Sequence, residues 1–107
     1  RAQMTEAMSL SGGAKTAVAE TWQSTGEWPT TNASAGLSPA ADIDGTYVAS
    51  VGVGANGQIT ATLRNQSPVV TELRGKVLTL TPANNTGSIS WTCGSYADDK
   101  YLPAGCR

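Results

Sequence analysis

The sequence predicts an α+β fold, in which a long N-terminal helix packs on a four-stranded antiparallel sheet and a disulfide-bounded loop follows at the C-terminus. Three observations predict this class. Apolar residues recur mostly at three- and four-residue steps over residues 1–25, which is typical of an amphipathic helix. Four later segments alternate apolar and polar residues, as antiparallel strands with one buried face do. Cys93 and Cys106 bracket twelve residues near the end of the chain.

The helix is predicted over residues 1–25. Its apolar stripe is formed by Met4, Met8, Leu10, Ala14, Val18 and Trp22. Gly12 and Gly13 weaken the middle of the helix by about 1 kcal/mol each relative to Ala, so the helix needs tertiary support along this stripe. Gly26 and Pro29 mark its end. Because the chain begins inside a helical pattern and without Met, we expect Arg1 to be a cut, with an N-terminal part missing.

Residues 26–46 predict a long connection between the helix and the sheet. Gly, Pro, Ser, Asn and Asp are frequent there and no period holds, which is typical of a loop. Trp28 and Leu37 are expected to pin this segment to the rest of the domain. A connection of this length is more often ordered or functional than a loop without a role.

The sheet is predicted over residues 47–92, with strands in "YVASVGV", "QITATL", "GKVLTLTP" and "SISWTC". The dipeptide Asn56-Gly57 between the first two strands is the strongest short-range hairpin signal. The residues expected to face the helix are Tyr47, Ala49, Val51, Val53, Ile59, Ala61, Leu63, Leu78, Leu80, Ile89, Trp91 and Cys93. Those expected to face solvent are Thr79, Thr81, Ser88, Ser90 and Thr92.

Composition narrows the classes of function. The 107 residues suffice for a single domain, 1–107, with one modest core. The net charge is -1 and no basic stripe is present, so the composition does not indicate nucleic-acid binding. His is absent, which excludes His-based acid–base catalysis and His metal ligands. The carboxylate pairs Asp42/Asp44 and Asp98/Asp99 lie in no motif that positions an acid and a base, so we expect neither an enzyme nor a cofactor.

The two cysteines predict a disulfide. In an extracellular context, a pair of cysteines in a small domain most simply forms one bond, here between Cys93 and Cys106. Closing a loop of about 14 residues stabilises by roughly 3 kcal/mol in the chain-entropy model. Inside the loop, "ADDK" and "PAGC" predict turns. Such a loop can be a clasp against fraying, a recognition surface, or both.

Three stretches resemble a known family. "GGAKTAVAETW" is similar to the exposed helix half of type IVa pilins of the Pseudomonas type. "DIDGTYVASV" and "LRGKVLTLTP" resemble their second-strand entry and third strand, and "WTCGSYADDKYLPAGC" resembles their terminal disulfide-bounded loop. The resemblance covers most of the chain and implies the type IV pilin fold. The basic residue that often follows the Pro of the loop is Ala104 here.

The resemblance also implies a function. Type IVa pilins polymerise into thin retractile surface fibres for twitching motility, attachment to host cells and surfaces, phage adsorption and, in some species, DNA uptake. The implied partners are other pilin subunits, a host-cell glycolipid or abiotic surface, and the inner membrane, which a very apolar N-terminal helix spans before assembly. The implied receptor-binding residues are Gly94, Ser95, Tyr96, Ala97, Asp98, Asp99, Lys100, Tyr101, Leu102, Pro103, Ala104 and Gly105. We expect this loop to bind mainly through backbone groups and turn shape.

Two alternatives stay open at this point. A major pseudopilin of a type II secretion system shares the helix-on-sheet plan, but usually lacks this disulfide and carries a calcium site instead. Asp98 and Asp99 could ligate calcium, although adjacent Asp residues are more often solvated turn residues. A free-standing secreted carbohydrate-binding module is the second alternative, and the apolar helical pattern at the N-terminus argues against it.

Overall fold

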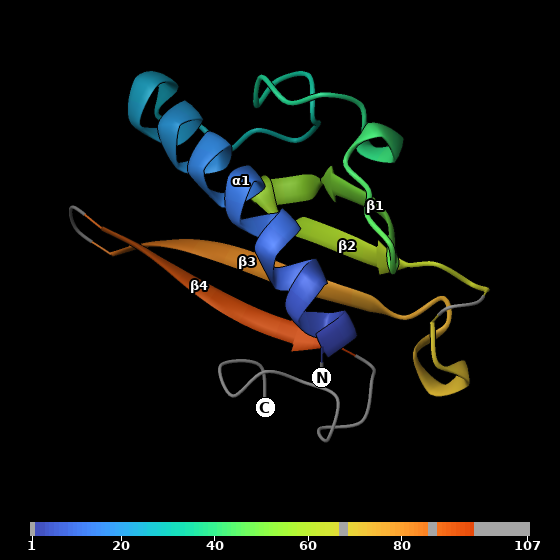
Figure 1. Cartoon of the computed structure of the whole chain (residues 1–107). Coiled ribbons are helices and arrows are strands. Elements are labelled where there is room, and N and C mark those ends of the chain that lie inside the picture. Colours follow the sequence, from blue (N-terminus) through green and yellow to red (C-terminus); the bar gives the residue numbers. More distant parts are fainter. Residues whose placement is uncertain (1, 67–68, 86–87, 96–107) are drawn as a thin grey trace.

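The computed structural model describes residues 2–66, 69–85 and 88–95. Within these residues, one helix lies across one face of a four-stranded antiparallel sheet (Figure 1). The strands follow one another in space as they do in the chain, in the order β1-β2-β3-β4. The elements are α1 (Ala2–Thr25), β1 (Val48–Val53), β2 (Ile59–Leu63), β3 (Val77–Asn85) and β4 (Ser88–Ser95). The predicted fold class is confirmed, and a single domain over 1–107 stays a prediction.

The helix α1 faces the sheet with small and apolar residues. Its buried side chains follow three- and four-residue steps and are Met4, Ala7, Ser11, Ala14 and Val18. Met8 and Leu10, which the predicted stripe included, are only half-buried and pack against the edge of the core. Ala7, Ser11 and Ala14 occupy the middle of the buried stripe, where short side chains allow close approach of the helix to the strands.

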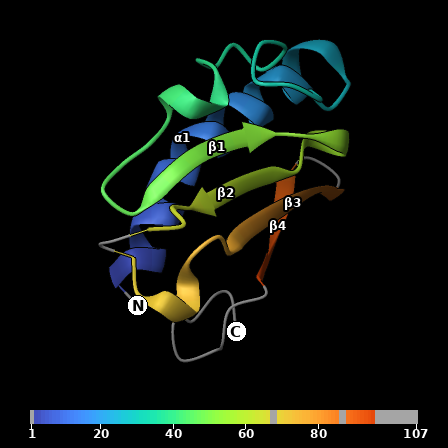
Figure 2. The ribbon, with the colours of Figure 1, turned by 90° about the vertical axis from the view of Figure 1, so that its right-hand side faces the viewer.

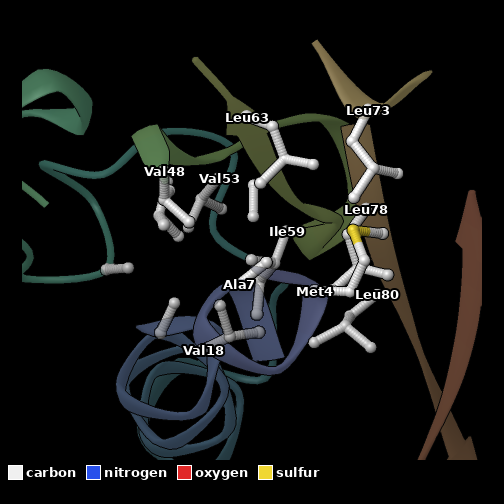
Figure 3. Packing of buried hydrophobic residues seen from close by; sticks show 14 of the residues in the cluster. Met4, Ala7, Val18, Val48, Val53, Ile59, Leu63, Leu73, Leu78 and Leu80 are labelled. Carbon is white, nitrogen blue, oxygen red and sulfur yellow. The ribbon is translucent and has the colours of Figure 1, made fainter. Parts of the chain in front are cut away.

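The core lies between α1 and the sheet (Figure 3). Met4, Ala7 and Val18 point from the helix towards side chains of β1, β2 and β3. The sheet and the loop before β3 contribute Val48, Val51, Val53, Ile59, Ala61, Leu63, Val69, Leu73, Leu78 and Leu80. Leu73 belongs to the short 3₁₀ helix η3 (Thr71–Leu73), which closes the end of the core beyond β2.

The inward face of β1 differs from the prediction. The pairing of β1 with β2 shifts between Val48 and Ser50, which marks a β-bulge. An extra residue in one strand reverses the side on which the residues before it lie. Val48 is therefore the fully buried residue at this end, whereas Tyr47 and Ala49, predicted to face inward, are half-buried. The predicted inward positions Val51 and Val53 are buried.

The hairpin between β1 and β2 is confirmed at the predicted dipeptide. Asn56 and Gly57 have φ of 59° and 75°, the left-handed conformation that a tight hairpin turn requires. The backbone N–H of Gly54 donates to the carbonyl of Gln58 at 2.8 Å and closes the turn.

The hairpin of β3 and β4 extends beyond the rest of the sheet. β2 pairs with β3 only as far as Leu80, so among the described residues the part of β3 from Thr81 onward pairs with β4 alone (Figure 1). Ile89, predicted to face inward, lies opposite Asn84 on this extension and is half-buried. Trp91 and Cys93 are also half-buried and pack against the core.

The connecting segment (residues 26–46) runs from the end of α1 to the free side of β1 (Figure 2). It contains the 3₁₀ helix η1 (Ala40–Asp42), which packs beside β1. Trp28 stacks on Trp22 of the helix, with ring centroids 4.2 Å apart and planes inclined by 16°. Leu37 packs against the core. The prediction that Trp28 and Leu37 pin this segment is therefore confirmed.

Candidate functional site

The candidate site is the predicted disulfide-bounded loop, whose first residues lie at the end of β4. The register of β4 with β3 places Cys93 opposite Leu80 and Gly94 opposite Thr79. Leu80 is 2 % exposed, so the strand pair is anchored in the core where the predicted loop begins. The hydroxyl of Thr79 donates to the carbonyl of Gly94 at 3.3 Å.

Gly94 sits in a narrow space. A Cβ at this position would lie 3.1 Å from Oγ1 of Thr79, closer than most real Cβ contacts, so glycine lets β4 lie against β3 here. Residues 96–107 lie outside the described residues, and with them Cys106 and the predicted receptor-binding residues from Tyr96 to Gly105. The Cys93–Cys106 disulfide and the binding role of the loop therefore stay predictions.

The carboxylate pairs do not form a catalytic arrangement in the described part of the chain. Asp44 pairs with Arg64, whose Nη2 lies 2.9 Å from Oδ2, and both side chains are substantially exposed. Arg64 also donates from Nε to the carbonyl of Gly45 at 3.1 Å. Residues 2–66, 69–85 and 88–95 bring no three His, Cys, Asp or Glu side chains together around a possible metal position. Asp98 and Asp99 lie outside these residues.

Sequence reasoning missed the contact that joins α1 to the beginning of β1. The carboxylate of Glu6 accepts hydrogen bonds from three successive backbone N–H groups. Tyr47 and Val48 donate to Oε1 at 2.8 and 3.0 Å, and Thr46 donates to Oε2 at 3.2 Å. In the sequence, Glu6 lies off the apolar stripe and resembles any solvated helix residue, so no local signal could have found it.

A shallow pocket of about 480 Å³ lies where the connecting segment leaves the helix. It is lined by Thr21, Thr25, Glu27, Trp28, Pro29, Thr30 and Ser34. Its hydroxyl groups are engaged locally, since Thr21 donates to the carbonyl of Ala17 at 2.9 Å and Ser34 Oγ accepts from the N–H of Thr31 at 3.1 Å. The arrangement stabilises the turn out of the helix.

Comparison with known proteins decides the family. The family model for pilin, a bacterial filament protein, matches residues 1–107. The chain belongs to the type IV pilins. A fimbrial protein, EcpC of Eikenella corrodens, is 49% identical over 110 residues, covering 100% of this chain and 70% of the relative. A fimbrial protein of Neisseria meningitidis serogroup A is 47% identical over 130 residues, covering 100% of this chain and 75% of the relative.

A type IV major pilin, PilE1 of Neisseria gonorrhoeae, is 40% identical over 127 residues, covering 100% of this chain and 69% of the relative. The pilin described here is thus similar to major pilins of the Neisseria type, and neither alternative, a pseudopilin or a free carbohydrate-binding module, is supported by these relatives. It is a structural, non-enzymatic subunit that assembles with other pilin subunits in an extracellular pilus. None of the described helices is long and apolar enough to cross a membrane.

Proposed function

We propose that this pilin subunit contributes to twitching motility and to attachment of the fibre to host cells and surfaces, and that Gly94–Gly105 makes the adhesive contact. The observation that carries the proposal is that the loop starts from residues held in the β3–β4 ladder. Cys93 and Gly94 lie on rungs of the β3–β4 ladder next to the buried Leu80. A loop that starts from such a rung begins in a fixed position, and a fixed loop loses little entropy when it binds.

The chemistry of the loop favours recognition by backbone groups. Its only charged residues are Asp98, Asp99 and Lys100. Exposed ion pairs contribute at most about 1 kcal/mol in water. Two turns and a Cys93–Cys106 bond would instead present N–H and C=O groups in one arrangement. A host-cell glycolipid, rich in hydroxyl groups, and an abiotic surface are the proposed targets, and phage or DNA contacts are secondary in a chain without a basic stripe.

The test is attachment of the purified domain to epithelial glycolipid and to an abiotic surface. Oxidised protein, reduced protein and Lys100→Ala are compared side by side, with Lys76→Ala as the matched control because Lys76 is an exposed lysine that precedes β3. We expect reduction to abolish attachment and Lys100→Ala to weaken it only slightly. If reduced protein with an unchanged circular dichroism spectrum binds as well as oxidised protein, the loop is only a clasp and the proposal is wrong.

The motility and inner-membrane stages implied by the family belong to the same proposal. Cells that produce the full-length protein with Cys93→Ser and Cys106→Ser should still assemble fibres if the loop serves attachment alone. Loss of surface fibres in these cells, seen by electron microscopy, would instead assign the disulfide a role in folding or assembly. Motility on agar is then compared between cells with the unsubstituted protein and cells with both cysteines replaced. Unchanged motility with lost attachment would separate retraction of the fibre from adhesion.

A further inference from the structure

The strand β1 is an edge of the sheet. Edge strands present backbone groups that can pair with another chain. In the hairpin, the N–H of Gly54 donates to Gln58 and therefore points towards β2. Because backbone groups alternate between the two sides along a strand, the groups of Val51 and Val53 point to the open side.

A side chain of the connecting segment occupies this open side. The Nδ2 of Asn32 donates to the carbonyl of Val51 at 3.1 Å, and its Oδ1 accepts from the N–H of Val53 at 2.7 Å. Bonds to the two residues that flank Gly52 follow the pattern of a parallel neighbouring strand, with the carboxamide taking the place of the N–H and C=O of one residue. Nδ2 also donates to the carbonyl of Ser38 at 2.9 Å, which fixes the orientation of the amide.

The middle of the same edge carries no side chain. A Cβ on Gly52 would lie 3.5 Å from Cβ of Ala40 and 3.7 Å from Oδ1 of Asn32, both ordinary van der Waals distances. Ala40 belongs to η1, so the connecting segment approaches Gly52 with the Cβ of Ala40 as well as with the carboxamide of Asn32. The carboxamide of Asn32 makes the hydrogen bonds to both Val51 and Val53, so a single substitution removes both bonds.

We propose that the edge of β1 is a latent pairing surface for a second copy of this chain, and that Asn32 keeps it closed. The edge is self-complementary. If two β1 strands lie antiparallel with Gly52 opposite Gly52, Val51 of each copy faces Val53 of the other, and each such pair exchanges two N–H···O bonds. The same patch is used on both copies, as a two-fold interface requires, and Gly52 adds no side chain of its own at the centre.

The closed edge suits a subunit of a fibre. Subunits in a pilus are held at high local concentration, and a helical fibre grows by head-to-tail contacts. A two-fold β1 pair closes on itself, so it removes two subunits from growth. Asn32 thus protects assembly by occupying the bonds through which two sheets would join.

The test is the oligomeric state of the 107-residue chain carrying Asn32→Ala. Sedimentation equilibrium over a wide range of protein concentration should show a dimer that forms with increasing concentration. The unsubstituted chain and Asn65→Ala, which changes an exposed asparagine after β2, should stay monomeric. In dilute Asn32→Ala, the Val53 amide should exchange about tenfold faster with deuterium because it has lost its acceptor. At high concentration, the Val51 and Val53 amides should both become protected.

A second substitution tests the geometry of the pair. In Asn32→Ala/Gly52→Lys, the two lysines lie opposite each other across the two-fold axis, and like charges directly opposite destabilise strand pairing. This protein should return to a monomer. Dimers that survive Gly52→Lys form through another surface and overturn the proposal. A folded Asn32→Ala that stays monomeric overturns it as well. If Asn32→Ala does not fold, Asn32→Ser, whose shorter polar side chain cannot reach both Val51 and Val53, is judged by the same criterion: it should dimerise, and a folded monomer overturns the proposal.

Discussion

Removal of the Glu6 carboxylate should loosen the joint between the helix and the sheet. The bonds from Tyr47 and Val48 are partly buried, whereas the bond from Thr46 is exposed. A hydrogen bond to a charged group contributes about 1.5–3 kcal/mol when it is shielded from water, and an exposed N–H is readily solvated after the loss. Two shielded bonds at the lower value predict that Glu6→Ala lowers the free energy of unfolding by about 3 kcal/mol.

The matched control is Glu20→Ala on the same helix, because Glu20 is exposed. Urea unfolding of both variants measures the difference, and hydrogen exchange should show faster exchange of the Tyr47 and Val48 amides in Glu6→Ala alone. Glu6→Gln keeps one carbonyl oxygen and loses the charge, so it should cost about half as much. A Glu6→Ala that unfolds within about 0.5 kcal/mol of Glu20→Ala would refute the reasoning.

Gly45 provides a second route to the same contact. A Cβ at Gly45 would lie 2.7 Å from Oε1 and 2.8 Å from Cδ of Glu6, so Gly45→Ala must displace the carboxylate. We expect Gly45→Ala to be destabilising on its own and nearly neutral in the Glu6→Ala background. The coupling in this double-mutant cycle should exceed about 1 kcal/mol. Equal costs of Gly45→Ala in the two backgrounds would show that the carboxylate is not what the new methyl group meets.

The remaining predictions concern the core, the helix and the cysteines. Leu80→Ala should destabilise by roughly 2–5 kcal/mol in a denaturant melt, because it opens a cavity among fully packed residues; a change below about 0.5 kcal/mol would place Leu80 outside the core. Gly13→Ala should stabilise by about 1 kcal/mol, since a Cβ there meets nothing within 4 Å, and an unchanged melting temperature would argue against it. Ser11 is 0% exposed and its hydroxyl has no hydrogen-bond partner in the described part of the chain, so Ser11→Ala should raise the melting temperature; a lower melting temperature would mean that the hydroxyl is satisfied. Mass spectrometry of folded, non-reduced protein should find Cys93 linked to Cys106, and two free thiols would disprove the bond.

Local pattern was sufficient to predict the elements of the fold. The spacing of Met4, Ala14 and Val18 predicts a helix because a helix repeats every 3.6 residues, whatever it packs on. The alternation in β2 and β3 predicts strands. Asn56-Gly57 predicts that β1 and β2 form a hairpin, since a tight hairpin turn demands positive φ. The family resemblance rested on such local motifs too, and the relatives confirm it.

What the sequence alone did not determine lies in contacts between distant segments. The bulge at Ala49 reverses the inward face before Ser50, and it exists only in the pairing of β1 with β2. Glu6 bonds to residues 40–42 positions away, and Asn32 bonds to Val53, 21 positions away. A polar side chain in a half-exposed stretch looks the same in sequence whether water or a backbone N–H is its partner. Only the tertiary structure brings that partner within reach, because the path between them is set by the packing of the helix and the connecting segment around the sheet.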